Sequence, residues 1–161
     1  MRIEIIPGYD RESDILALFD AYMNMLTTND PTFKVYLDVQ NYEEEIAHLG
    51  SKYGLPDGRL YLLCYDGEPA GCIALRKIDS CNCELKRLYV KERYRGLGLG
   101  KMLVHRILVD AKEIGYTYVL LDTLPFLKAA IRIYRDFGFV EIEKYNDSPM
   151  DNAIYMKLEL K

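Results

Sequence analysis

The sequence has no excess of positive charge. Its 161 residues include 21 lysines and arginines against 25 aspartates and glutamates, which gives a formal net charge of −4. A general nucleic-acid binder needs a basic surface that displaces counterions from phosphates. The composition therefore argues against nucleic acid as a partner, although a local basic patch is compatible with it.

Long apolar segments are also lacking. No apolar run approaches the roughly 20 residues that span a bilayer. Residues 1–7 alternate polar and apolar side chains like a strand, without the apolar core of a secretory signal. We therefore expect no membrane partner and a cytoplasmic location.

Cysteine and histidine are few and poorly spaced for metal binding. The chain has four cysteines and two histidines, and no His or Cys pair at zinc spacing accompanies Cys81 and Cys83. A domain of this size does not need disulfides, so we expect reduced thiols and no metal. A cysteine nucleophile would need a histidine partner, and nothing in the sequence points to one.

We predict one domain, residues 1–161, because domains usually run from about 100 to 200 residues. Half of the residues are hydrophobic, which is enough for a core. Apolar patterns predict strands at residues 2–6, 59–65, 69–77, 84–90, 118–122, 139–143 and 154–160. Helical stripes predict helices at residues 14–28, 42–53, 100–114 and 125–137, with residues 27–41 as a connection. Asp66 and Gly67 predict a hairpin turn. The fold class is α/β (α+β type), with three antiparallel strands in succession.

A glycine-rich turn follows the strand that ends at Val90. Gly96, Gly98 and Gly100 alternate with other residues and lead into a helix. Glycine lets backbone N–H groups approach a ligand closely, and the first turn of a helix leaves N–H groups without internal partners. Such a turn favours phosphate, so we predict a phosphate-bearing ligand at residues 95–101.

Two nucleotide-binding motifs do not fit this turn. A Walker A loop needs a glycine where Arg95 stands, and Ser or Thr where Met102 stands. A Rossmann fingerprint needs a third glycine where Lys101 or Leu103 stands. The remaining pattern is a basic residue, two spacers, glycine, one spacer and glycine.

This pattern, RGLGLG at residues 95–100, resembles the pyrophosphate loop of the GNAT superfamily of acyl-CoA-dependent N-acetyltransferases, (Gln/Arg)-x-x-Gly-x-(Gly/Ala). ELKRLYV at residues 84–90 looks like the family's central strand. AIRIY at residues 130–134, followed by GF at 138–139, is similar to its A-x-x-L-Y-x-x-x-G-F segment. The resemblance implies a mixed, mostly antiparallel sheet of about six to seven strands with about four helices. Its two central strands would splay apart around the acyl-pantetheine arm.

The resemblance also implies a site for acetyl-CoA as cosubstrate. Backbone groups of Leu88 and Val90 would pair with the pantetheine like an extra strand. The pyrophosphate would be held by the turn, that is by Arg95, Gly96, Leu97, Gly98, Leu99, Gly100 and Lys101. For Lys101, a solvated helix residue is an equally good interpretation. Many family members carry Asn seven residues before the helix tyrosine, and Leu127 here removes that polar contact.

Two residues are candidates for catalysis. Acyl transfer from a thioester to an amine needs a neutral amine and a stabilised thiolate. By resemblance, Tyr134 is the acid at the thiolate, and its alternative is a core residue on the buried stripe of its helix. Glu84 lies where the family often places a general base. Its alternative is an ion pair with Lys86, which strand alternation puts on the same face.

The sequence therefore predicts an enzyme, an acetyl-CoA-dependent N-acetyltransferase that uses direct transfer in a ternary complex. The alternative is a non-catalytic acyl-CoA-binding regulatory module. The acceptor, a small-molecule or peptide amine, stays open. The acidic run of Glu43, Glu44 and Glu45 is either a solvated helix start, which we prefer, or a rim for a cationic acceptor. A homodimer is common in the resembling family, and the oligomeric state also stays open.

Overall fold

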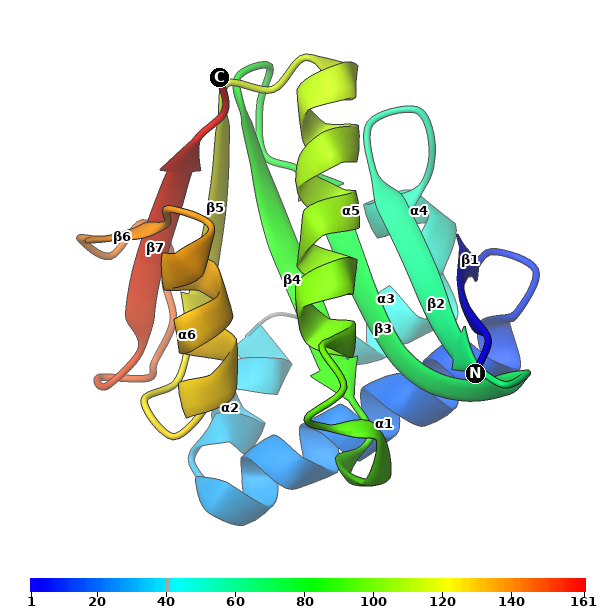
Figure 1. Ribbon diagram of the computed structural model, residues 1–161. Helices are drawn as coiled ribbons and strands as arrows, with labels where there is room; N and C mark the ends of the chain where they lie inside the picture. Colours follow the sequence, from blue (N-terminus) through cyan, green and yellow to red (C-terminus); the bar gives the residue numbers. More distant parts are fainter. Residues whose placement is uncertain (40) are drawn as a thin grey trace.

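The computed structural model describes residues 1–39 and 41–161. Its strands form one seven-stranded sheet. Its order is β1-β2-β3-β4-β5-β7-β6, and every neighbouring pair is antiparallel except β4 and β5 (Figure 1). The strands are β1 (Ile3–Pro7), β2 (Arg59–Tyr65), β3 (Glu68–Lys77), β4 (Asn82–Val90), β5 (Tyr118–Thr123), β6 (Val140–Ile142) and β7 (Ile154–Glu159). The predicted mixed, mostly antiparallel sheet is confirmed.

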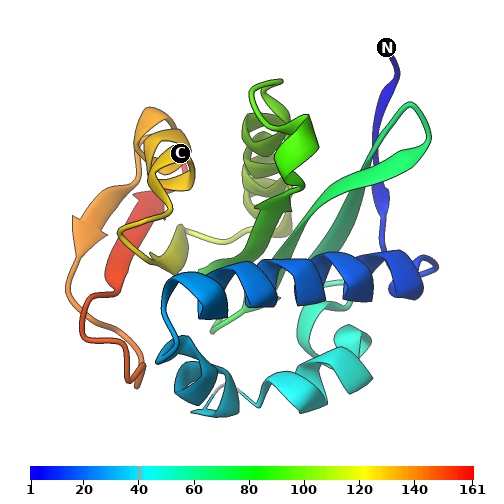
Figure 2. The ribbon, with the colours of Figure 1, turned by 90° about the horizontal axis from the view of Figure 1, so that it is seen from below.

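Helices cover both faces of this sheet. The α-helices are α1 (Glu12–Asn29), α2 (Phe33–Val39), α3 (Tyr42–Ala47), α4 (Leu49–Tyr53), α5 (Leu99–Ile114) and α6 (Lys128–Asp136). Figure 2 shows α5 and α6 on one face and α1 to α4 on the other. One apolar core includes Leu103 and Ile107 of α5, and a second includes Ile15 and Phe19 of α1. In the described parts of the chain, no helix is long and apolar enough to cross a membrane.

Two turns follow the sequence prediction. Asp66 and Gly67 join β2 to β3 with positive φ angles of 50° and 84°. Gly115 ends α5 in the left-handed region at φ 111°, and its N–H bonds to the carbonyl of Ala111 at 3.2 Å. Glycine takes this conformation without a Cβ clash, so both turns follow from local chemistry.

The prediction of a connection at residues 27–41 is wrong, because α1 extends into this segment and α2 lies within it. Phe33 and Tyr36 of α2 join an apolar cluster with Met23 and Leu26 of α1. A helix this short is not stable by itself and depends on such packing. Its seven residues also give too little length for an apolar period to be recognised.

Two other helix predictions are wrong. The single helix expected at residues 42–53 is broken at His48, which has φ −139° and separates α3 from α4. The helix expected from Pro125 begins only at Lys128, because the N–H of Leu127 first closes a turn onto the carbonyl of Leu124 at 3.0 Å. The presence of α2 and the division of the 42–53 helix give six α-helices in the described residues where about four were expected.

The parallel strands β4 and β5 pair over a short length and then separate. Their register ends where Glu84 faces Leu120, whereas β4 continues to Val90 and β5 to Thr123. Figure 1 shows the two strands diverging from their paired end, and Figure 2 shows α1 running across the sheet below β4. The splay implied by the resemblance is therefore present.

A bulge in β4 changes the direction of one side chain in this splayed part. The register with β3 shifts between Cys72 and Ala74, and Arg87 has a left-handed φ of 61°. A bulge inserts one extra residue and interrupts the alternation of faces. In this irregular segment four consecutive residues, Leu85, Lys86, Arg87 and Leu88, line the same cavity.

Candidate active site

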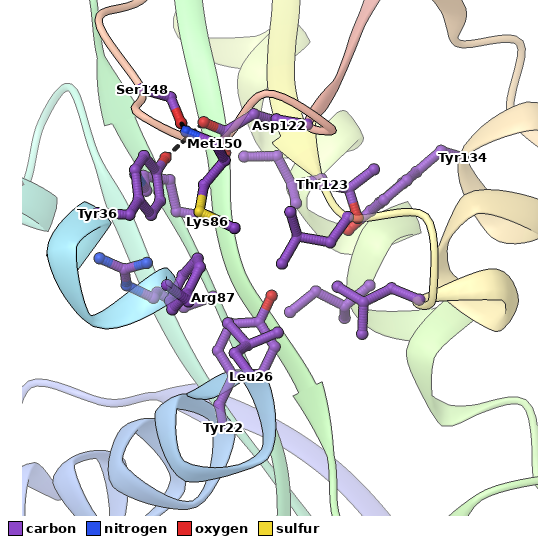
Figure 3. A pocket seen from close by; sticks show the side chains of 16 residues that line it. Tyr22, Leu26, Tyr36, Lys86, Arg87, Asp122, Thr123, Tyr134, Ser148 and Met150 are labelled. Atoms are coloured by element: carbon purple, nitrogen blue, oxygen red, sulfur yellow. Dashed lines mark hydrogen bonds between the residues drawn. The ribbon is translucent and has the colours of Figure 1, made fainter. Parts of the chain in front are cut away.

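A cavity opens where β4 and β5 diverge (Figure 3). Its walls come from β4, from the end of β5, from α1 and α2, from α6, and from the loop before β7. The polar side chains that line it are those of Tyr22, Tyr36, Lys86, Arg87, Asp122, Thr123, Tyr134 and Ser148. The cavity thus combines cationic, anionic and hydroxyl groups beside apolar walls.

Tyr134 is placed in this cavity by α6. Its side chain extends from the helix into the cavity in Figure 3, and the residue is only 5% exposed. Its ring packs on that of Phe139, with centroids 5.7 Å apart, and Gly138 between them turns the chain at φ 102°. Burial raises the pKa of the Tyr134 hydroxyl well above 10. The hydroxyl is therefore protonated at neutral pH and can donate a hydrogen bond.

Glu84 is buried in an ion pair outside the cavity lining. Its Oε1 accepts a hydrogen bond from Arg76 Nε at 2.7 Å, and Tyr145 donates its hydroxyl to Oε2. Lys86 Nζ lies 3.7 Å from the same Oε1. Burial would raise the pKa of this carboxyl, but Lys86, Arg76 and the two hydrogen bonds lower it to about 2. The ion-pair alternative is thus present, while the role as a base stays a prediction.

The glycine turn has the geometry of an anion site. Gly96 and Gly98 have left-handed φ angles of 82° and 77°, and Gly98 is the N-cap of α5 without a side-chain cap. The amides of the first turn of a helix have no partner within it, so those of Leu99, Gly100 and Lys101 point outward from the helix start. A Cβ on Gly100 would lie 3.1 Å from Ile133 Cδ1 of α6, which shows how closely the two helices approach.

The backbone of β4 presents a free edge beside this turn. The N–H of Lys91 bonds to the carbonyl of Ala70 in β3 at 2.8 Å, so the groups of Leu88 and Val90 face the opposite side, toward the splay. Arg95 already uses part of this edge, because its Nε donates to the Val90 carbonyl at 3.0 Å. The pairing of Leu88 and Val90 with the pantetheine stays a prediction.

Leu127 lines the cavity from the N-cap position of α6. The family often has an asparagine at this point, and the apolar side chain leaves no hydrogen-bonding group there. The replacement of asparagine by Leu127 therefore changes the chemistry of the cavity wall.

Two polar residues of the cavity, Tyr36 and Asp122, have no counterpart among the predicted site residues, and Lys86 was predicted only as an ion-pair partner. The hydroxyl of Tyr36 donates to Asp122 Oδ2, and Asn146 Nδ2 donates to the same oxygen at 2.9 Å. Asp122 is a charged residue near the end of a buried apolar strand, and this contrast was the sequence signal that could have identified it. Tyr36 lies in the segment predicted as a connection, so no local signal pointed to it. Lys86 was considered only as a partner of Glu84.

The acidic run on α3 separates into two environments. Glu43 and Glu44 are exposed, as expected of a solvated helix start, but Glu45 is buried. Its Oε1 lies 2.6 Å from Lys52 Nζ, and both of its oxygens bind Arg87. Burial would raise the pKa of Glu45, but these two cations lower it to about 2. Its carboxylate is therefore engaged within the protein.

The sequence profile described as "Acetyltransferase (GNAT) family" matches residues 19–139. The chain belongs to this family. An uncharacterized N-acetyltransferase of Schizosaccharomyces pombe is 40% identical over 131 residues, which cover 80% of each protein. A GNAT-family acetyltransferase from Staphylococcus aureus superposes with a TM-score of 0.78 at 22% identity, over 99% of this chain and 100% of that one. The PaiA N-acetyltransferase of Thermoplasma acidophilum, solved in complex with coenzyme A, gives a TM-score of 0.75 at 18% identity over 99% of each chain. The predicted family and enzyme class are confirmed.

Proposed function

We propose that this GNAT enzyme moves an acetyl group from acetyl-CoA to a primary amine by direct attack in a ternary complex. The observation that carries the proposal is the Tyr134 hydroxyl inside a cavity formed by the separation of β4 and β5. The turn at residues 95–101 fits a pyrophosphate through its outward amides, and the β4 edge at Leu88 and Val90 fits the pantetheine. The coenzyme A bound by the PaiA enzyme supports the same ligand for this fold.

In this reaction the neutral amine nitrogen attacks the thioester carbonyl carbon, the C–N bond forms, and the C–S bond then breaks. The sulfur leaves with the bonding electron pair and takes up a proton, while the nitrogen gives one up. Tyr134 donates a hydrogen bond to the departing sulfur, and this bond strengthens as negative charge develops there. For the amine proton, Glu84 has two interpretations, a base or an ion-pair residue, and its engagement with Arg76 and Tyr145 outside the cavity lining favours the ion pair.

Direct transfer is favoured over an acyl-enzyme route by the state of the buried thiols. Burial raises the pKa of Cys72 and of Cys83 to about 12. A thiolate is the nucleophilic form of cysteine, and at neutral pH these two residues hold it only in trace amounts. Neither residue lines the cavity.

The test combines binding with turnover. We expect coenzyme A and acetyl-CoA to raise the melting temperature, and mass spectrometry of an amine panel to find acetylated products with equivalent release of free coenzyme A. The absence of binding by both ligands would refute the proposal. Binding without any acetylated amine would instead support the non-catalytic regulatory module.

A further inference from the structure

Lys86 is a buried ammonium that lacks a close acceptor. Its side chain is 5% exposed, and it lines the cavity. Its one ion pair, with Glu84 Oε1, spans 3.7 Å, which is too long for a hydrogen bond. Within the described residues, Lys86 Nζ makes no hydrogen bond. The atom is also not fully enclosed by protein. The three donors of this group are thus available to a molecule in the cavity.

The anionic groups near Lys86 are engaged elsewhere. Glu84 accepts from Arg76 and Tyr145, and Asp122 accepts from Tyr36 and Asn146. Burial lowers the pKa of Lys86 to about 8, although Glu84 opposes this change. At pH 7, below this pKa, the ammonium is the main form, and its one ion-pair partner, Glu84, is too distant for a hydrogen bond.

We infer that the acceptor amine carries a carboxylate, as amino acids do, and that Lys86 binds this carboxylate inside the cavity. The inference rests on the proposed acetyl transfer and specifies its acceptor. A carboxylate supplies the hydrogen-bond acceptor that the Lys86 ammonium lacks, and such charge-assisted hydrogen bonds are among the stronger ones in proteins. A cationic acceptor such as a polyamine would instead bring a second positive charge toward Lys86.

Paired acceptors test this assignment. L-alanine, L-serine, L-aspartate, L-methionine and L-phenylalanine are each compared with the α-carboxamide and with the decarboxylated amine, all with acetyl-CoA. We expect the best amino acid to exceed its two analogues in kcat/KM by at least about tenfold, because a hydrogen bond to a charged group is lost in both analogues. Equal or better use of an analogue would overturn the inference while leaving the proposed acetyl transfer intact. No acetylation of any compound would overturn both.

Variants then assign the preference to Lys86. Lys86→Met should raise KM for the amino acid about tenfold or more, remove the preference over the carboxamide, and leave coenzyme A affinity unchanged. Lys86→Arg should keep part of the preference. Lys112→Met, an exposed position on α5, is the matched control and should behave like the wild type.

Two other results would replace the inference. A loss of kcat in Lys86→Met with unchanged KM, together with a shifted limb of the pH–rate profile, would make Lys86 a base. An acetyl mass increment on Lys86 itself, found by peptide mass spectrometry after incubation with acetyl-CoA, would make it an acyl acceptor.

Discussion

Arg87 of β4 binds Glu45 of α3 through two hydrogen bonds, from Nε to Oε2 at 2.9 Å and from Nη2 to Oε1 at 2.7 Å. The two side chains are 4% and 1% exposed. Because Arg87 lies at the β4 bulge, the pair fixes α3 against the strand that forms one wall of the cavity. A bidentate pair sets orientation as well as distance, so it holds the Arg87 side chain in one direction.

Glu45→Gln should destabilise the protein by about 3 to 5 kcal/mol, because it leaves Arg87 and Lys52 without their buried counter-charge. Urea unfolding at neutral pH measures the change. Glu43→Gln is the matched control from the same helix turn, and its exposed side chain should cost less than about 1 kcal/mol. Equal losses in the two variants would contradict the structural role of the pair.

Stability should fall as the solution becomes acidic. The pKa of Glu45 and that of Glu84 are each lowered from 4.5 to about 2 in the folded protein. A depressed pKa contributes stability that is complete above the unfolded value and is lost as pH falls toward the folded value. Urea unfolding between pH 7 and pH 3 should therefore show a constant free energy down to about pH 5 and a steep decline below it. A flat profile to pH 3 would show that the two ion pairs are not maintained in solution.

Gly98→Ala should weaken coenzyme A binding. The left-handed φ of 77° costs a residue with a Cβ about 1–2 kcal/mol, and relief of that strain would rotate the amides at the start of α5. Gly67→Ala is the matched control, because Gly67 has φ 84° and, like Gly98, no atom within 4 Å of an added Cβ. Calorimetry should show similar losses of stability in both variants and a lower coenzyme A affinity in Gly98→Ala alone.

Tyr134→Phe should lower kcat by about 10²- to 10⁴-fold, the usual contribution of a general acid. Coenzyme A affinity should not change, since the ring that packs on Phe139 is retained. Tyr65→Phe removes a hydroxyl from the end of β2, outside the cavity lining, and serves as the control. A kcat equal to that of the wild type in Tyr134→Phe would place the residue in the core alone.

The Glu84→Gln variant distinguishes two roles of this carboxylate, a catalytic base and a structural ion-pair partner. If the carboxylate takes the amine proton, the variant loses kcat and the acidic limb of the pH–rate profile changes. If the carboxylate only pairs with Arg76, the variant loses stability, and Arg76→Gln loses a similar amount while both retain the profile. The buried geometry leads us to expect the second result, measured by urea unfolding and by initial rates across pH.

Local chemistry explains which parts could be predicted from the sequence. The hairpin at Asp66 and Gly67, the turn at Gly98 and the helix end at Gly115 each depend on backbone conformations that glycine or aspartate favours within a few residues. The Tyr134 segment could be placed because its motif is contiguous.

Long-range contacts explain why other parts of the fold and of the site could not be predicted from the sequence. Tyr36 reaches Asp122 across 86 positions of sequence, and Arg87 reaches Glu45 across 42. No local period encodes a contact of this kind. The bulge at Arg87 also breaks strand alternation, so face assignments beyond Lys86 could not be extrapolated from Glu84. The acidic run likewise looked uniform, although only Glu45 is buried.

The separation of β4 from β5 leaves a strand edge at Leu88 and Val90 without a neighbouring strand. Exposed edges usually invite pairing with other chains, but this one is half-buried and lies between helices that cover the two faces of the sheet. Hydrogen bonds that most sheets complete on folding would here be completed on binding. The amides of Leu88 and Val90 should therefore exchange with solvent deuterium readily in the free enzyme and slowly with acetyl-CoA, and the melting temperature should rise with cosubstrate concentration.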